Sequence, residues 1–385
     1  MSDDWQNAGF GLYVHWPFCE AKCPYCDFNS HVARDIDQTA WANAYLKELG
    51  RIAAELPDRV LNTVFFGGGT PSLMSPDTVA AIISAAGRHW RLANDLEITL
   101  EANPGSVETG RFSAYRDAGV NRVSLGVQAL NDTDLKRLGR IHTVQEARTA
   151  LDVAHRHFDR VSFDLIYARQ DQTRQQWQDE LKLALSLGTD HLSLYQLTIE
   201  QGTAFGDRYA AGKLRGLPQD DLSADMYEAT QDICAAHGLA RYEVSNHARP
   251  GQESRHNLIY WRYGDYAGIG PGAHGRLTIG GHRYATDCFR SPETWLTAVN
   301  KGMGESVRSR LNAQEQAQEY LMMGLRLNEG IDLARYKNMS GRELNPEARK
   351  KLSEIGMIED HKSQLIVSKQ GFMVLNSVLS ELLTD

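Results

Sequence analysis

Residues 12–30 read LYVHWPFCEAKCPYCDFNS, and this stretch decides the fold. A short apolar run, residues 11–16, leads into a loop that carries Cys19, Cys23 and Cys26 in the spacing Cys-x3-Cys-x2-Cys. Three thiolates on one loop can face a single iron–sulfur cubane, which four thiolates normally hold. The missing fourth ligand leaves one iron open to the amino and carboxylate groups of S-adenosylmethionine. We therefore predict a three-cysteine [4Fe-4S] cluster.

Zinc is the alternative metal for the same loop. Structural zinc requires four ligands, usually as two separated pairs of Cys or His. The sequence has no second Cys-x2-Cys pair, although His15 and His31 are near enough to be considered as a fourth ligand. The other two cysteines, Cys234 and Cys288, stand alone, and we expect both to be small buried apolar side chains.

The composition is that of a globular protein with one large core and a smaller second domain: 385 residues, 42% hydrophobic and 23% charged. A net charge of -8 argues against a nucleic-acid partner. The first ten residues have neither the basic start nor the apolar stretch of a signal peptide. No apolar run is long enough to span a membrane, so we expect a cytoplasmic protein with no integral membrane segment.

The first two thirds of the chain alternate between strand and helix patterns. Short β-branched and apolar runs predict six buried parallel strands, at residues 11–16, 63–66, 96–100, 122–127, 161–166 and 191–195. Periodicity does not separate an open sheet from a barrel. Polar residues collect at the carboxyl ends of different strands, including Thr70, Glu101 and Gln128, where barrel enzymes build their sites. This placement favours a barrel.

The last part of the chain has a different pattern. Residues from about 312 are helical, a second helix covers about 346–355, and a short strand at 364–367 precedes a final helix over 372–383. This order predicts a mostly helical, winged-helix-like domain. We divide the chain into a barrel, residues 1–240, a connecting segment, residues 241–305, and a C-terminal domain, residues 306–385.

The cysteine motif, followed by FGGGTPS at 66–72, resembles the radical S-adenosylmethionine (SAM) superfamily, whose members share a partial (β/α)6, TIM-like barrel. Four further motifs extend the resemblance over nearly the whole chain: EANPG at 101–105, SLGVQ at 124–128, FDLIY at 163–167 and HNLIYW at 256–261. They are similar to the coproporphyrinogen III dehydrogenase-like branch, and especially to its haem chaperones, which implies a HemN-like C-terminal domain.

The resemblance also implies an S-adenosylmethionine pocket. Tyr25 suits an aromatic side chain packed on adenine, or else ordinary loop packing. The positions that match the family's pocket are Tyr13 for the methionine part, Glu101 for the methionine part or the ribose, Gly68, Gly69 and Thr70 for the amino group, and Gln128, Arg140 and Asp164 as further polar residues of the same pocket or of a second one. Close backbone approach to a ligand suits the glycines.

The HNLIYW motif places His256 near two large aromatic side chains, Tyr260 and Trp261. Histidine is a common axial ligand of haem iron, and flat aromatics suit a porphyrin. A hydrogen-bonded core histidine with packed aromatic neighbours is the alternative that the chemistry alone favours, and the resemblance makes haem contact by these three residues an equal candidate. His247 and His274 are weaker candidates.

Three departures from the relatives bear on function. The dehydrogenases carry a further cysteine where this chain has Phe28, and they have a longer N-terminal arm, whereas only about a dozen residues precede the first strand here. The relatives also have a Gly-Leu-Pro turn where this chain has Ala168, Arg169 and Gln170, so the loop after Asp164 should differ in shape. The resemblance thus implies a haem chaperone that binds a [4Fe-4S] cluster, S-adenosylmethionine and haem, with an electron donor and a haem-accepting protein as partners. An oxygen-independent coproporphyrinogen III dehydrogenase and an RNA-modifying radical SAM enzyme are the alternatives.

Overall fold

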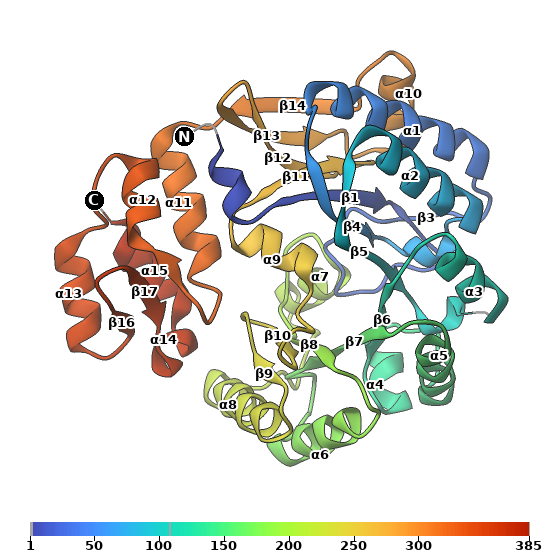
Figure 1. The fold of residues 1–385 in the computed structure, drawn as a ribbon. Helices are drawn as coiled ribbons and strands as arrows, with labels where there is room; N and C mark the ends of the chain where they lie inside the picture. The colour runs from blue at the N-terminus through green and yellow to red at the C-terminus, as the bar shows by residue number, and fades with distance from the viewer. Residues whose placement is uncertain (1–2, 108, 385) are drawn as a thin grey trace.

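The computed structural model describes residues 3–107 and 109–384, and Figure 1 shows their arrangement. Their largest sheet has 12 strands and curls into an open barrel. Listed from edge to edge, its strands are β14 (Glu305–Arg310), β13 (His282–Cys288), β12 (His274–Ile279), β11 (Asp265–Ile269), β1 (Phe10–Trp16), β4 (Val60–Gly68), β5 (Arg91–Ala102), β6 (Arg122–Gln128), β7 (Arg160–Tyr167), β8 (His191–Gln196), β10 (Asn246–Ala248) and β9 (Ala240–Arg241).

The six predicted parallel strands are β1, β4, β5, β6, β7 and β8, which lie side by side in this order. Helices cover the outer side of this part of the sheet (Figure 1): α1 (Gln38–Glu55), α2 (Pro76–His89), α3 (Thr109–Asp117), α4 (Asp132–Arg137), α5 (Val144–His157), α6 (Arg174–Leu185) and α8 (Asp220–Ala236). The partial barrel is therefore confirmed, with the carboxyl ends of its strands at one rim.

Local sequence signals explain where several helices begin. Ser75 caps α2 by accepting a hydrogen bond from the Thr78 amide, and Pro76 occupies the first turn. Thr143 forms a capping box with Glu146 at the start of α5, and α6 begins in the same way. These caps fix the helix starts, and so the lengths of the loops at the rim.

The connecting segment predicted at 241–305 is instead largely part of the main sheet. Strand β11 pairs with β1 in parallel, and β12, β13 and β14 extend the sheet beyond it as antiparallel hairpins. Two short helices accompany them, α9 (Arg255–Trp261) and α10 (Pro292–Asn300). The periodicity missed β11 because the strand is short and contains glycine, so that only its long-range pairing with β1 defines it.

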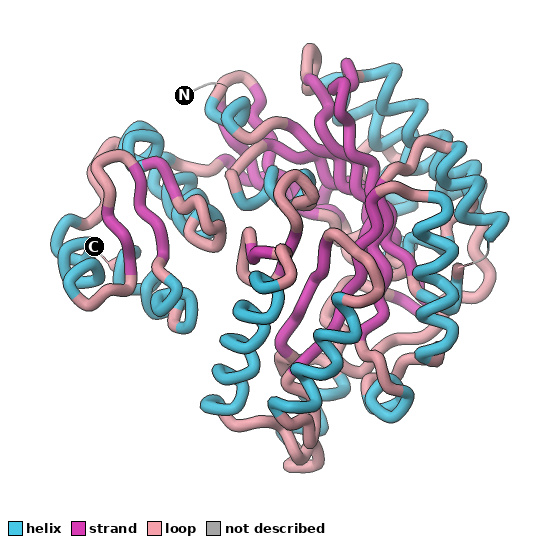
Figure 2. Tube along the Cα trace, turned by 60° about the horizontal axis from the view of Figure 1, so that its bottom comes forward, coloured by secondary structure: helices cyan, strands magenta, loops and turns pink. Residues whose placement is uncertain are grey.

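The C-terminal domain has its own core and stands beside the barrel (Figure 2). A three-stranded sheet of β15 (Ile331–Asp332), β17 (Gln364–Val367) and β16 (Ile358–Asp360) packs with α11 (Ala313–Gly324), α12 (Leu333–Ser340), α13 (Pro346–Glu354), α14 (Lys369–Met373) and α15 (Leu375–Leu383). The sequence predicted neither β15 nor α12, and it merged α14 and α15, which are separated at Val374.

Six short elements complete the described chain: β2 (Phe18–Cys19), β3 (His31–Val32), α7 (Ala204–Ala210) and the 3-10 helices η1 (Asp4–Asn7), η2 (Pro71–Leu73) and η3 (Pro104–Ser106). Among the described residues, no helix is both long enough and apolar enough to cross a bilayer. Cys234 and Cys288 are buried, as predicted, within the barrel's core.

Candidate functional site

The three motif cysteines lie on one loop at the rim, directly after β1. Strand β2 pairs in parallel with β3, and the His31 amide donates a hydrogen bond to the Pro17 carbonyl, so both ends of the loop are held together. Cys19, Cys23 and Cys26 are free thiols, each half-buried. The local fold thus presents three cysteines from a short closed loop.

Each of the three sulfurs has a hydrogen-bonding group beside it. Thr70 Oγ1 donates to Cys19 Sγ at 3.4 Å, and Arg140 Nη1 donates to Cys23 Sγ at 3.3 Å. Ser30 Oγ lies 4.0 Å from Cys26 Sγ. Hydrogen-bond donors around thiolates are a property of iron–sulfur sites, where they help to set the reduction potential.

The donor set fits a cubane better than a single ion. In the part of the chain that the structure describes, no three Cys, His, Asp or Glu side chains converge on one ion position. Zinc would require such convergence, because its sulfur ligands lie about 2.3 Å from the metal. Burial raises the pKa of Cys19 and Cys26, so both are thiols in the unloaded chain, and ligation to a metal would remove their protons.

Arg140 connects the cysteine loop with two strand ends of the barrel. Its Nη2 donates to Asn103 Oδ1 at 2.6 Å and to the Gly126 carbonyl at 2.9 Å, while Nη1 reaches Cys23. Tyr25 packs beside it against Phe205, with ring centroids 6.4 Å apart. Tyr25, the residue predicted to contact adenine, therefore packs on an apolar side chain in the unloaded chain.

The glycine run after β4 approaches the neighbouring backbone closely. Gly68 has φ +111°, and a Cβ atom there would lie 2.7 Å from the His15 ring and 2.8 Å from the Trp16 carbonyl oxygen. Its amide donates to Glu101 Oε2 at 3.3 Å. Only glycine fits this position, and the result is a backbone edge open to a ligand.

Two carboxyl groups inside the barrel rim hold protons unusually tightly. Burial, with the nearby Asp164 as the second cause, raises the pKa of Glu101 to about 8. Burial also raises the pKa of Asp164 to about 6, although hydrogen bonds from Ser193 and Ser124 oppose the shift. Glu101 is therefore mainly protonated at neutral pH in the unloaded chain.

A cavity of about 460 Å³ opens beside the cysteine loop, within the size range of small-molecule sites. It brings together five of the predicted residues: Tyr13, Gly68, Glu101, Tyr260 and Trp261. Thr70 and Arg140 line a separate small pocket next to Cys23, and neither of these two cavities is lined by Gln128, Asp164 or His256. Only some of the predicted S-adenosylmethionine and haem residues therefore line one common cavity.

Gln128 lies at the end of β6 in the left-handed region, with φ +71°. Its side chain approaches Gly126 from the same side as Asn103 and Arg140, because a Cβ on Gly126 would lie 3.0 Å from Gln128 Nε2. The predicted polar residues Gln128 and Arg140 therefore meet over one glycine.

His256 is a buried histidine with both ring nitrogens engaged. Nδ1 lies 2.6 Å from Thr63 Oγ1, and Nε2 lies 2.6 Å from the Tyr260 hydroxyl. Burial lowers the pKa of His256 to about 3. The ring packs so closely on β1 that a Cβ on Gly11 would lie 3.1 Å from it. In this arrangement the histidine orients Tyr260, and neither nitrogen is free for an iron.

The weaker histidine candidates differ from each other. His247 is buried in β10, where its Nε2 pairs with Gln231 at 3.2 Å. His274 lines the 460 Å³ cavity together with Phe28 and with two residues that the sequence did not suggest, namely Arg290 and Met323. A sequence signal for His274 does exist, because Gly280 and Gly281 mark a two-residue turn that sets the register of its hairpin.

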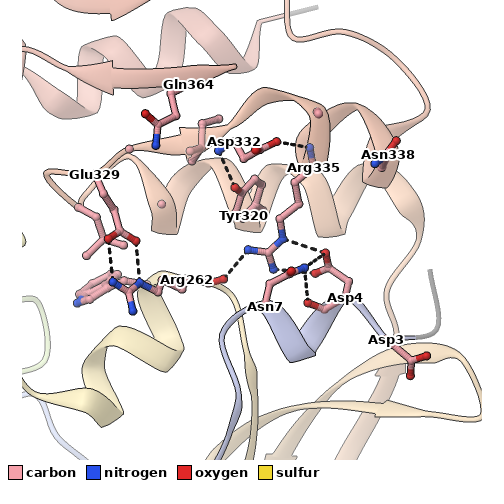
Figure 3. Close-up of a pocket in the computed structure, with 16 residues that line it drawn as sticks. Asp3, Asp4, Asn7, Arg262, Tyr320, Glu329, Asp332, Arg335, Asn338 and Gln364 are labelled. Atoms are coloured by element: carbon pink, nitrogen blue, oxygen red, sulfur yellow. Dashed lines mark hydrogen bonds and ion pairs between the residues drawn. The ribbon is translucent and has the colours of Figure 1, made fainter. Parts of the chain in front are cut away.

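Trp261 also lines a second, larger cavity of about 930 Å³, between the barrel and the C-terminal domain (Figure 3). Here Arg335 of α12 forms a two-pronged ion pair with Asp4, at 2.8 and 2.7 Å, and Arg262 pairs with Glu329. These contacts fix α9, and with it the cavity wall at Trp261, against the C-terminal domain.

The altered loop after β7 is built around Arg169. This side chain is buried and pairs with Asp134 and Glu180, and its Nη1 donates to the Ile166 carbonyl. Asp164 keeps its place in β7, where it accepts a hydrogen bond from Ser124 at 3.3 Å. The loop is therefore held by this buried cluster, and Asp164 remains in the barrel interior.

Comparison with known proteins agrees with the family resemblance of the sequence motifs. The radical SAM superfamily model matches residues 13–184, and the HemN C-terminal domain model matches residues 311–374. The chain is 37% identical to the haem chaperone HemW of Escherichia coli, over 97% of this chain and 98% of that protein. It is 40% identical to the mitochondrial radical S-adenosyl methionine domain-containing protein 1 of Bos taurus, over 97% of this chain and 87% of that one.

A solved structure shares the overall fold. Coproporphyrinogen III oxidase (HemN) from Escherichia coli superposes with a TM-score of 0.82 at 21% identity, covering 100% of this chain and 92% of that one. The likeness includes the C-terminal domain, since it extends over the whole chain.

Proposed function

The chain belongs to the radical SAM superfamily, in the branch that contains the HemW haem chaperones and HemN, and from this premise we propose that it binds haem and passes it to an acceptor protein. The observation that carries the proposal is the 460 Å³ cavity beside the cysteine loop. Its wall contains the aromatic side chains Tyr260, Trp261 and Tyr266, which suit a flat apolar ligand.

In this proposal the cluster and S-adenosylmethionine are resident cofactors. Cys19, Cys23 and Cys26 would hold the cluster, which when reduced supplies an electron to the sulfonium of S-adenosylmethionine. The Arg140 guanidinium stabilises negative charge at the Cys23 sulfur, and Thr70 does so at Cys19. These contacts are made by this chain's own side chains before any ligand binds.

The open backbone edge at Gly68 and the carboxyl of Glu101 form the methionine end of the proposed cofactor site. Glu101 can release its proton when a cation arrives, because an opposite charge favours the ionised form. Tyr13 lies on the same cavity wall, with its hydroxyl 3.0 Å from His15 Nδ1.

The rival function is oxidative decarboxylation of coproporphyrinogen III to protoporphyrinogen IX. Phe28 occupies the position where the dehydrogenases carry a further cysteine, and its side chain is 59% exposed at the cavity. Decarboxylation by radical chemistry requires exclusion of water. An exposed cavity mouth favours a carrier that loads and unloads haem over an enclosed reaction chamber.

An electron donor for the cluster and a haem-accepting protein complete the proposal. We place the chain in the cytoplasm, because a three-cysteine iron–sulfur site requires reduced thiols. All five cysteines are free in the described part of the chain.

An anaerobic experiment on the reconstituted full chain tests the proposal. Titration with haem should give a saturable Soret band, and a haem-free cytochrome added afterwards should take the haem at a rate set by the chain's release of it. Coproporphyrinogen III, offered with S-adenosylmethionine and a reductant, should be recovered unchanged. Stoichiometric decarboxylation, or the absence of saturable haem binding, would overturn the proposal.

A further inference from the structure

We propose that His274, oriented by Asp287, is the axial ligand of the bound haem iron, an inference that rests on the proposed haem-binding function. The two residues face each other across the β12–β13 hairpin, where the register pairs their Cα atoms. The His274 Nδ1 atom lies in close contact with Asp287 Oδ1. A carboxylate on one imidazole nitrogen is the usual support for a metal-ligating histidine.

The orientation leaves the other nitrogen available. In the part of the chain that the structure describes, Nε2 of His274 has no hydrogen-bond partner, and the side chain is 68% exposed at the cavity. When Nδ1 donates its hydrogen bond to Asp287, Nε2 carries the lone pair that can bind iron.

The other two histidines near the cavity do not share this property. His15 Nδ1 pairs with the Tyr13 hydroxyl at 3.0 Å, and its Nε2 pairs with the Asn29 carbonyl at 2.9 Å. His256 has both nitrogens engaged with Thr63 and Tyr260. Either ring would have to break a buried hydrogen bond to reach an iron, whereas His274 would not.

The surroundings of His274 suit the rest of the haem. Arg290 lines the same cavity, is exposed, and forms no ion pair with the described residues, so its guanidinium is available to a propionate. Tyr260, Trp261 and Tyr266 provide the aromatic wall. Met323, from α11 of the C-terminal domain, also lines the cavity. Residues from the barrel extension and from the C-terminal domain thus enclose one ligand volume.

The test compares variants of the reconstituted full chain titrated anaerobically with haem. His274→Ala should lower haem affinity at least tenfold and change the Soret band and EPR signature of the histidine-ligated iron, and added imidazole should restore the wild-type signature by occupying the vacated position. Asp287→Asn should raise the haem reduction potential, because an imidazole without its carboxylate donates less charge to ferric iron. Iron and sulfide content should stay at the wild-type level in both variants.

His282→Ala is the matched control, because His282 is an exposed histidine of the same hairpin that does not line the cavity. It should leave the affinity and the spectrum unchanged. A wild-type chain that fails to bind haem would refute the proposed function itself. A wild-type chain that binds haem, with an identical spectrum and affinity in His274→Ala, would refute only the ligand assignment. Rescue of a His256→Ala variant by imidazole, in place of His274→Ala, would also refute the ligand assignment.

Discussion

Arg140 Nη1 donates a hydrogen bond to Cys23 Sγ across 3.3 Å, which joins the loop after α4 to the cysteine loop after β1. The guanidinium is half-buried and also contacts Asn103 and the Gly126 carbonyl, so its position is fixed from three sides. A fixed positive charge beside a sulfur ligand stabilises the more negative, reduced state of a cluster.

Replacing Arg140 by methionine should therefore lower the reduction potential of the reconstituted cluster, with little loss of iron. A redox titration followed by EPR measures this shift. Arg137→Met is the control, since Arg137 has a 44% exposed side chain on the preceding helix and pairs with Asp171. Equal potentials in wild type and Arg140→Met would show that the Arg140 charge does not affect the reduction potential of the cluster.

The cysteine variants test the ligand set directly. Cys19→Ser, Cys23→Ser or Cys26→Ser should each lose most of the iron and sulfide after anaerobic reconstitution, because two remaining thiolates do not hold a cubane firmly. Iron and sulfide analysis, with the visible absorption of the cluster, gives the measurement. Cys234→Ala should retain the cluster in full, since Cys234 is buried in α8. Full iron retention in all three motif variants would exclude the proposed ligands.

The six central strands and several helix starts were predictable because their signals are local. A short apolar run predicts a buried strand, and the pair Thr143 and Glu146 predicts a helix start within four residues. The role of His256 was not predictable in this way, since its two hydrogen bonds go to Thr63, 193 positions away in the chain, and to Tyr260. Long-range packing therefore determines that neither nitrogen of His256 is free.

For His274, in contrast, the sequence contains a local signal, the two-glycine turn of its hairpin. Gly280 and Gly281, with φ of +57° and +80°, form the two-residue turn that pairs Ile279 with His282. Counting outward along the hairpin from that pair brings His274 opposite Asp287. Turn chemistry could therefore have paired the two residues, although only the folded barrel shows that they border the cavity.

Glu101 gives a prediction about pH. Folding raises its pKa from 4.5 to about 8, so the folded chain keeps a proton that the unfolded chain has lost between these values. Stability of the unloaded chain should consequently fall as pH rises from 4.5 to 8, by on the order of 1 kcal/mol for a half-buried group. Glu101→Gln, which still accepts from the Gly68 amide, should remove this slope.

Thermal unfolding midpoints at pH 5 and pH 8.5 measure the effect. The advantage of Glu101→Gln over wild type should be small at pH 5 and larger at pH 8.5. Glu200→Gln, at an exposed position, should follow wild type at both values. Parallel curves for wild type and Glu101→Gln would mean that the carboxyl ionises freely in the folded chain.

Arg169 holds the loop after β7 through a buried cluster of ion pairs. Its guanidinium is 4% exposed and pairs with Asp134 and with Glu180, whose other oxygen accepts from the Leu130 amide at 2.6 Å. Arg169→Met would leave the Glu180 charge buried without its partner, a loss of about 3–5 kcal/mol. The unfolding midpoint in urea should drop accordingly.

Glu180→Gln combined with Arg169→Met should recover part of that loss, because the neutral amide still accepts from Leu130 and no unpaired charge remains. The coupling between the two positions should exceed about 1 kcal/mol in a double-mutant cycle. Arg174→Met is the matched control, because its 3.9 Å contact with Asp225 lies at the surface and should contribute less than about 0.5 kcal/mol. Additive effects at Arg169 and Glu180 would show that the buried pair does not hold this loop, and that the left-handed residues Ala168 and Asp171 determine its shape instead.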